Sequence, residues 1–289
     1  MDRPTMHRPS ELIQGLKGLA TLPDIYIRLS DVVNNPRSSA ADAGRVISDD
    51  PGLTARLLKL VNSAMYGFPS RIDTVSEAIG IVGTAQLQDL ALATSVIRAF
   101  ADMPATLVTM ESFWRHSVAC AVSSRLIAAH RGEPNVERHF VAGLLHDIGR
   151  PILYLRLPDE SNRALEKSRR SGLPLFREEH DLLGFDHTEV GAALLEAWRL
   201  PHSLREAVQY HHAPLCARRY GLEACVVHIA DLMANALELG SSGEHGVPPL
   251  EVAAWERLEL PVSIVPEILA EAEDHYEETV GILALDQAA

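Results

Sequence analysis

Residues 50–67 read DPGLTARLLKLVNSAMYG, and this stretch has the features of a helix that packs against a hydrophobic core. Asp50 can cap the first turn, and Pro51 occupies the first helical position, where a missing amide hydrogen is tolerated. The apolar residues then recur at steps of three and four until Gly67, so they share one face of a helix. They are Leu53, Leu57, Leu60, Val61 and Ala64. The stretch therefore predicts an amphipathic helix whose leucines face the interior.

Helical patterns of the same kind recur along the chain. Aromatic residues make up only 5% of the composition, whereas Leu, Ala, Glu and Arg recur at close spacing, which favours helices over a sheet. We expect one helix to follow Ser39 and to stop at Asp49. The other expected helices are 74–83, 84–100, 111–130, 139–157, 161–171, 186–199, 203–212, 222–239 and 250–283, the last with a break near Pro261. The sequence therefore predicts an all-α fold.

A connection at residues 101–106, which contains Pro104, divides these helices into two groups. We expect a first helical subdomain over residues 1–105 and a second over residues 106–240. Residues 241–289 are expected to form an acidic C-terminal helical extension that packs on the bundle. From residue 251 onward this extension has ten acidic residues and one base, Arg257, which accounts for most of the formal net charge of -13.

The charge distribution argues against nucleic-acid binding. Affinity for a duplex depends on clustered Lys and Arg side chains that neutralise phosphates. Neither residue type occurs between Ile72 and Ile97, where two short helices are expected in the arrangement of a DNA-reading pair. We therefore expect no direct DNA binding, although a small anionic ligand in a pocket is compatible with the charge.

The composition also bears on cellular location. The three cysteines include no CxxC pair and leave one over in any disulfide scheme, which is typical of a reducing compartment. No stretch approaches 18 uncharged apolar residues, so we expect neither export nor a membrane span. These observations favour a cytoplasmic protein.

The second half of the chain contains a set of side chains that suits a metal site. Imidazole nitrogens and carboxylate oxygens are ligands of divalent ions, and helical bundles build such sites from facing helices. Seven such residues lie on five expected helices: His116, His146, Asp147, His187, His211, His212 and Asp231. His146 and Asp147 are adjacent and would point about 100° apart on a helix, so they share a site only if that helix faces it squarely. The spacing by itself leaves a buried, hydrogen-bonded His-Asp pair open as an alternative.

These residues resemble the pattern of a known superfamily. His116, the stretch GLLHDIG at 143–149, and Asp231 within 228–232 resemble the His, His-Asp, Asp pattern of the HD metal-dependent phosphohydrolases. The first half resembles the helical subdomain that precedes this pattern in the HDOD family of bacterial signalling proteins. That resemblance rests on Leu22-Pro23, residues 50–54, Leu57-Leu58, Asn62-Ser63-Ala64 and residues 79–83. The matches together span about residues 12–239.

The resemblance implies a divalent metal centre of one or two ions, with Fe, Mn, Mg and Zn as candidates. The ligands of a first ion would be His116, His146, Asp147 and Asp231. His187, His211 and His212 match, in order, additional ligands of the related HD-GYP phosphodiesterases and would hold a second ion, with Asp147 between the two. Asp147 and Arg150 would then be the catalytic residues, because a metal lowers the pKa of bound water and a guanidinium, from Arg150 or Arg115, offsets phosphate charge.

The resemblance supports two functional interpretations. HDOD proteins are regulatory modules, so the first is a bacterial signal-transduction module with a metal- or ligand-responsive pocket. Its partners would be signalling proteins of a sensor-kinase or response-regulator pathway, and its ligand a nucleotide or a phosphorylated small molecule. The alternative is an active metal-dependent phosphohydrolase, and a third possibility is an adaptor with a relic site. The chain continues His212-Ala213-Pro214 and lacks the GYP motif, which favours the regulatory interpretation.

Overall fold

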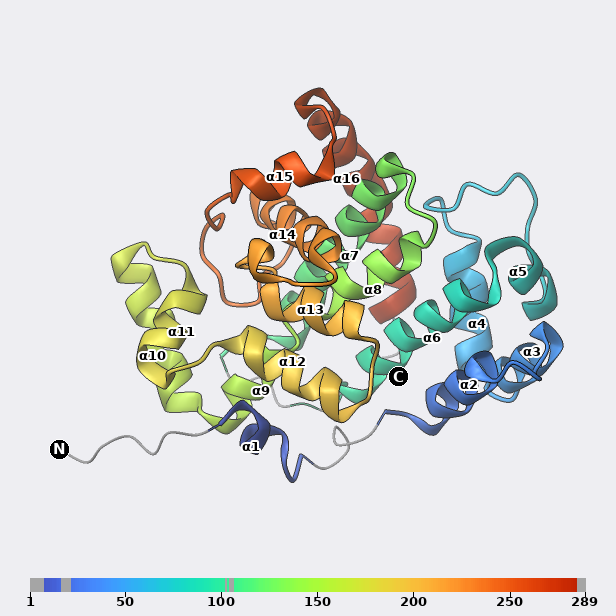
Figure 1. Ribbon diagram of the computed structural model, residues 1–289, viewed down its shortest axis with the longest axis horizontal. Coiled ribbons are helices and arrows are strands. Elements are labelled where there is room, and N and C mark those ends of the chain that lie inside the picture. The colour runs from blue at the N-terminus through green and yellow to red at the C-terminus, as the bar shows by residue number, and fades with distance from the viewer. Residues whose placement is uncertain (1–7, 17–21, 102, 104–106, 285–289) are drawn as a thin grey trace.

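The computed structural model describes residues 8–16, 22–101, 103 and 107–284. These residues form helices joined by loops, and none of them belongs to a strand, which confirms the all-α prediction (Figure 1). The helices of the first half are α1 (Pro9–Ile13), α2 (Asp24–Asn34), α3 (Ala40–Ser48), α4 (Pro51–Val61), α5 (Val75–Val82) and α6 (Thr84–Ala99). Those of the second half are α7 (Met110–Arg131), α8 (Val136–Leu145), α9 (Gly149–Arg156), α10 (Pro158–Ser171), α11 (Leu175–Leu183), α12 (His187–Ala197), α13 (His202–Tyr210), α14 (Gly221–Ala236), α15 (Val252–Leu258) and α16 (Val265–Ala284). Short 3-10 turns lie at Pro214–Cys216 and Val262–Ile264.

Helices α2 to α6 pack against one another, and their buried apolar side chains belong to the same core cluster as those of the second half. The side chains of Ser39, Asp50 and Thr74 each accept a hydrogen bond from a first-turn amide of α3, α4 and α5, as capping residues do. The predicted inward face of α4 is confirmed for four of its five residues, which are at most 2% exposed, but the helix ends at Val61, and Ala64, expected on the same face, lies beyond it and is exposed. The four buried residues are Leu53, Leu57, Leu60 and Val61. Full burial of one such side chain is worth about 1.5–3 kcal/mol, so this face stabilises the first bundle.

The central helix of the second bundle is α7, which packs against α8, α14 and α16. Helix α1, near the start of the described residues, and helix α16, at their end, each contact helices of the other half of the chain. Although α1 precedes the first bundle in sequence, it lies against α9 and α12 (Figure 1). The acidic α16 packs against α7 and also contacts α4. The expected division at residue 105 lies outside the described residues and stays a prediction, as does the connection around Pro104.

The helix α6 joins the two bundles and is buried along most of its length. Its Asp89 is 2% exposed and accepts a hydrogen bond from Nε of Arg138 on α8 at 3.0 Å. Phe100, directly after α6, meets Trp114 and Trp198 edge to face, with ring centroids 6.1 and 6.4 Å apart. These contacts connect α6 to α8, and the residue directly after α6 to α7 and to the end of α12.

The segment expected as one helix at 139–157 is two helices, α8 and α9, with a turn at residues 146–148. Pro151 explains the break, because it has no amide hydrogen to donate to the carbonyl of Asp147 and its ring crowds that carbonyl. The amide of Arg150 donates to the same carbonyl instead, at 2.9 Å. The two candidate metal ligands His146 and Asp147 therefore lie in a turn and not in a regular helix.

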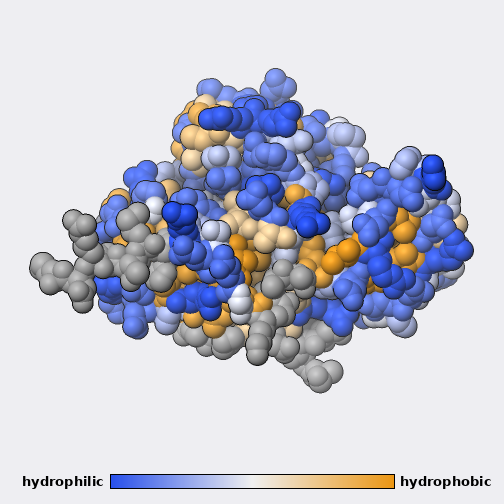
Figure 2. All heavy atoms as spheres, turned by 60° about the horizontal axis from the view of Figure 1, so that its bottom comes forward, coloured by the Kyte–Doolittle hydropathy of each residue, from blue (hydrophilic) through white to orange (hydrophobic). Residues whose placement is uncertain are grey.

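Charged and polar side chains predominate on the surface shown in Figure 2. Apolar residues gather in small groups between them (Figure 2). Among residues 8–16, 22–101, 103 and 107–284, none of the helices has the length and apolar character that crossing a membrane requires.

Candidate metal centre

The seven histidines and aspartates singled out in the sequence lie together in the second bundle. They come from α7, the turn between α8 and α9, the start of α12, the residues directly after α13, and α14. Their ligand atoms form two adjoining groups, each within 4.8 Å: His116, His146 and Asp231, and then Asp147, His187, His211 and His212. Six of the seven residues are at most 4% exposed, and His212 is partly buried.

Asp147 lies between the two groups, with one carboxylate oxygen toward each. Its Oδ1 lies 2.9 Å from Nε2 of His187 and 3.6 Å from Nε2 of His211. Its Oδ2 lies 3.4 Å from Nε2 of His146 and 3.9 Å from Nε2 of His116. A carboxylate in this position can bridge two cations.

Asp231 completes the first group from α14. Its Oδ1 lies 3.2 Å from Nε2 of His116 and 3.5 Å from Nε2 of His146. Ligand atoms about 2.1 Å from a tetrahedral ion lie about 3.4 Å from one another. The distances from Asp231 to the two histidines are therefore compatible with one shared metal ion.

The nitrogen atoms that face the centre have no hydrogen-bond partner among the described residues. They are the Nε2 atoms of His116, His146, His187, His211 and His212. Oδ1 of Asp147 is also buried without a hydrogen-bond partner among these residues. A buried polar atom without a partner is unfavourable, so a group of them in one place fits a bound ion. Nδ1 of His146 donates to the carbonyl oxygen of Gly143 at 2.7 Å, and Nδ1 of His211 donates to that of Val208 at 2.8 Å. In the neutral rings this leaves the Nε2 lone pairs free for a metal.

The electrostatics of the centre also fit a cation. Burial raises the pKa of Asp147, but Arg150 and the imidazoles outweigh burial and hold this pKa well below its usual range; neighbouring histidines do the same for Asp231. Burial lowers the pKa of His187, yet the carboxylates of Glu179 and Asp147 raise it to about 9. The centre therefore contains two buried negative charges that need positive charge beside them. Imidazole protons supply it in the metal-free protein, and a divalent ion would replace those protons.

Further side chains orient the inward-facing groups. Glu179 of α11 accepts hydrogen bonds from Nδ1 of His187 at 2.6 Å and from its amide at 3.1 Å. Nδ2 of Asn235 donates to Oδ1 of Asp231 at 2.8 Å. Such partners set the direction and basicity of metal ligands. The sequence patterns had not indicated either Glu179 or Asn235.

A local signal for the helix that carries Glu179 is nevertheless present. Pro174 stands directly before α11 and Gly184 directly after it, an asymmetry that is typical of helix ends. Gly184 has a φ of +81°, which favours glycine at this cap. Nothing in that local pattern, however, relates the helix to His187.

The cation beside Asp147 is Arg150 and not Arg115. Arg150 is 1% exposed, and its Nε lies 3.4 Å from Oδ2 of Asp147. Arg115 turns outward, pairs with Glu277 of α16 and lies over the ring of Tyr276. The expectation that either arginine would offset charge at the site is therefore wrong for Arg115 in this structure.

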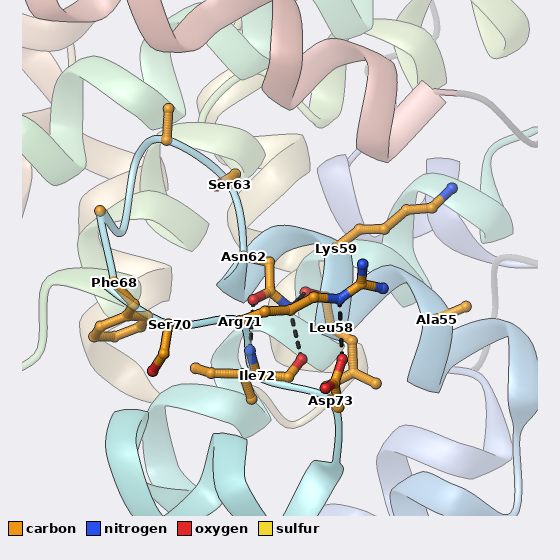
Figure 3. Close-up of a pocket in the computed structure, with 12 residues that line it drawn as sticks. Ala55, Leu58, Lys59, Asn62, Ser63, Phe68, Ser70, Arg71, Ile72 and Asp73 are labelled. Atoms are coloured by element: carbon orange, nitrogen blue, oxygen red, sulfur yellow. Dashed lines mark hydrogen bonds and ion pairs between the residues drawn. The ribbon is translucent and has the colours of Figure 1, made fainter.

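A separate pocket lies in the first bundle, between the end of α4 and residues 62–73 (Figure 3). Asn62 closes this loop, because its Oδ1 accepts from the amide of Ile72 at 2.8 Å and its Nδ2 donates to the carbonyls of Ile72 and Leu58 at 2.7 Å. Oγ of Ser63 donates to a carbonyl of α4 at 2.6 Å. Both polar side chains thus satisfy local backbone groups, and the pocket is not part of the histidine centre.

Comparison with solved structures relates this fold to known proteins. An HDOD domain protein with unknown function from Geobacter sulfurreducens superposes with a TM-score of 0.78 at 24% identity, covering 95% of this chain and 96% of that one. A protein named "Putative phosphohydrolase" from Shewanella amazonensis SB2B superposes with a TM-score of 0.72 at 25% identity, covering 96% and 99%. The first of these establishes likeness of fold alone.

The sequence comparisons agree with the structural ones. The chain is 27% identical over 192 residues to an uncharacterized protein of Treponema pallidum (strain Nichols). This match covers 66% of the chain but only 37% of that protein, so the chain spans little more than a third of its relative's length. The model of the HDOD domain family matches residues 19–214, more than half of the chain. The chain therefore belongs to the HDOD domain family.

Proposed function

We propose that this chain is a signal-transduction module whose second bundle holds a divalent metal centre, and that metal binding stabilises one conformation of the domain. The observation that carries the proposal is the donor set itself. Within the described part of the chain, no hydrogen-bond partner meets the inward-facing Nε2 atoms, and six of the seven residues are at most 4% exposed. An ion that binds only the folded state stabilises it in proportion to the logarithm of its concentration over Kd.

The depth of the centre supports a regulatory role over hydrolysis. A phosphodiester must reach a metal ion to be cleaved. Here the loop that follows α14 covers the centre, and Oγ of Ser242 donates to Oδ2 of Asp147. In this closed form the centre is suited to hold ions rather than to exchange substrates and products.

The partners that fit this role are signalling proteins of a sensor-kinase or response-regulator pathway in the cytoplasm. Membership of the HDOD family supports this expectation. A nucleotide or a phosphorylated small molecule is the ligand class that suits a buried guanidinium such as Arg150.

An active metal-dependent phosphohydrolase is the second candidate. It is favoured by the complete set of inward-facing ligands together with the guanidinium of Arg150 beside Asp147. A metal bound there would activate water and polarise a phosphoryl oxygen. Asp147 would hold two ions together, and Arg150 would offset charge on the phosphate.

Metal content and turnover, measured on the same samples, test these proposals. Protein purified without a chelating tag is assayed for bound metal by mass spectrometry and for cleavage of bis(p-nitrophenyl) phosphate with added Mn²⁺ or Fe²⁺. Asp147→Asn keeps the shape of the side chain and removes the charge shared by both groups, so it should lose the metal. Asp274→Asn, an exposed position on α16, makes the same change away from the centre and should keep it.

Metal in the wild type without turnover, and its loss in Asp147→Asn together with a fall in thermal stability, supports the regulatory module. Turnover by the wild type that is lost in Asp147→Asn supports the phosphohydrolase instead of the regulatory module. Absence of metal from the wild type, even after reconstitution with each ion, refutes both and leaves only an adaptor with a relic site.

A further inference from the structure

The loop that covers the metal centre, which we call the strap (residues 240–245), is hydrogen-bonded to the helices on both sides of it. The amide of Ser241 donates to Oγ of Ser112 at 3.0 Å and to the carbonyl of the same residue at 3.1 Å. Oη of Tyr154 donates to the carbonyl of Ser242 at 2.7 Å. A Cβ atom added to Gly243 would lie 2.2 Å from Oη of Tyr154, so the backbone approaches α9 as closely as glycine permits. The strap is thus held on both sides above the centre.

The carboxylate of Glu244 on this strap lies between two groups that bind anions. Both of its oxygens accept from the amide of Leu175, at 3.0 and 3.2 Å, and Leu175 is the first residue of α11. Its Oε2 lies 3.6 Å from Nη2 of Arg150. An amide at a helix N-terminus and a guanidinium are the groups with which proteins hold phosphate.

Two hydrogen-bond donors of Arg150 are not satisfied by Glu244 in this arrangement. Its side chain is 1% exposed, and its Nε and Nη1 atoms are buried without a hydrogen-bond partner among the described residues. Nε lies 3.4 Å from Asp147, but not in hydrogen-bond geometry. A carboxylate has two oxygens, whereas a phosphate has three or four and can satisfy more of these donors. The guanidinium is therefore incompletely matched by Glu244.

We propose that Arg150 and the amide of Leu175 form a binding position for a phosphate group, and that Glu244 fills this position in the closed state. The inference rests on the proposed function for its location beside the metal centre, and it names how access to that centre is regulated. A phosphorylated ligand would displace Glu244, take up its contacts with Arg150 and Leu175, and lift the strap from Asp147.

The elements around the strap are arranged to permit this displacement. Helices α10 and α11 form a hairpin at one edge of the molecule (Figure 1). The hairpin reaches the centre through a few side chains: Glu179 bonds His187, and Phe176 stacks on His212 with ring centroids 4.2 Å apart. Oγ of Ser168 and Nδ1 of His245, 3.3 Å apart, join the hairpin to the end of the strap. Displacement of the strap would therefore break few contacts with the hairpin, together with the hydrogen bonds between Ser241 and Ser112 at the start of α7.

Titration calorimetry with inorganic phosphate tests the proposal. Glu244→Gln removes the competing charge but keeps the side chain's shape, and it should bind phosphate at least about tenfold more tightly than the wild type, a change of about 1.4 kcal/mol. Arg150→Met in the Glu244→Gln background should lose this gain. Glu273→Gln, at an exposed position on α16, changes the net charge equally and should leave phosphate affinity unchanged.

Two results would overturn the proposal. One is a folded Glu244→Gln variant whose affinity for phosphate equals that of the wild type. The other is a gain that survives Arg150→Met, because phosphate would then sit on the metal ions alone. Hydrogen exchange on the wild type gives a test without substitution: saturating phosphate should speed exchange of the Ser241 and Gly243 amides, and unchanged exchange counts against displacement of the strap.

Metal content of the same samples keeps this inference separate from the proposed function. If all samples hold metal and Glu244→Gln shows no gain, the phosphate position fails and the metal centre stands. If no sample holds metal and the gain still depends on Arg150, the metal centre fails and the phosphate position stands.

Discussion

Glu179 and His187 lie on successive helices and meet in the interior, where Nδ1 of His187 donates to Oε2 of Glu179 at 2.6 Å. The same oxygen accepts from the amide of His187 at 3.1 Å. This contact directs Nε2 of the ring toward Asp147, 2.9 Å away. Glu179 is 2% exposed and comes from α11, a helix that the sequence patterns did not predict. A carboxylate behind the imidazole is the arrangement that orients histidine ligands in metal proteins.

The first prediction concerns this carboxylate. Glu179→Gln should weaken metal binding by about 10–100-fold, because the amide accepts a weaker hydrogen bond from His187 and no longer supports the ring's basicity. Metal affinity, measured by competition with a chromophoric chelator, checks the prediction. Glu273→Gln, at an exposed position on α16, is the control and should bind as the wild type does. Equal affinities in all three proteins would show that Glu179 only packs.

The second prediction concerns the core of the first bundle. Leu57 is 2% exposed, so Leu57→Ala should lower the free energy of unfolding by about 2–5 kcal/mol through lost burial and the cavity left behind. Denaturant unfolding followed by circular dichroism measures this loss. Lys59→Ala lies on the exposed side of the same helix and should change stability by less than about 0.5 kcal/mol. A similarly small loss for Leu57→Ala would mean that α4 is wrongly phased.

The third prediction concerns acid stability. Burial, with a smaller contribution from Arg131 and Arg138, lowers the pKa of His139 from 6.5 to about 4. Its Nδ1 is buried without a hydrogen-bond partner among the described residues. The unfolded chain therefore takes up the proton more readily than the folded one. The stability that neutral His139 provides is complete above pH 6.5 and is lost as the pH falls toward 4, a difference of about 3 kcal/mol.

His139→Gln removes this titrating group, so its free energy of unfolding should fall less between pH 7 and pH 4 than that of the wild type. Urea unfolding at a series of pH values within this range measures both curves. His202→Gln, whose side chain is 50% exposed, should follow the wild-type curve. Parallel curves for wild type and His139→Gln would refute the assignment.

The fourth prediction concerns the strap. Gly243 has a φ of +121° and no room for a Cβ atom beside Tyr154, so Gly243→Ala should either strain the closed strap by about 1–3 kcal/mol or detach it. Faster hydrogen exchange at residues 240–245 and a lower Tm would show this. Gly246→Ala, three residues on, meets open space and should leave both measurements unchanged. A Gly243→Ala variant with wild-type exchange would show that the strap does not fit as tightly as described.

Local sequence patterns predicted most of the helices, although not α1, α2 or α11, and they identified the inward-facing donors. The caps at Asp50 and Thr74 and the apolar spacing of α4 act within a few residues, so they can be recognised without knowledge of the fold. The histidines and aspartates could likewise be recognised, because residue type and a family resemblance survive in sequence. The single helix expected at 139–157 is wrong, because Pro151 breaks it, and the effect of a proline on the preceding turn is a local one that the sequence contains.

The tertiary structure alone decided which side chains orient these donors and which loop covers them. Glu179 contacts His187 across eight residues and two helices, and Ser242 reaches Asp147 across 95 residues. Arg115 and Arg150 are equivalent as residue types, yet packing turns one toward α16 and buries the other beside Asp147. Such pairings depend on which helix faces lie against each other, and this is set by the summed burial of the whole core rather than by any short stretch of the chain.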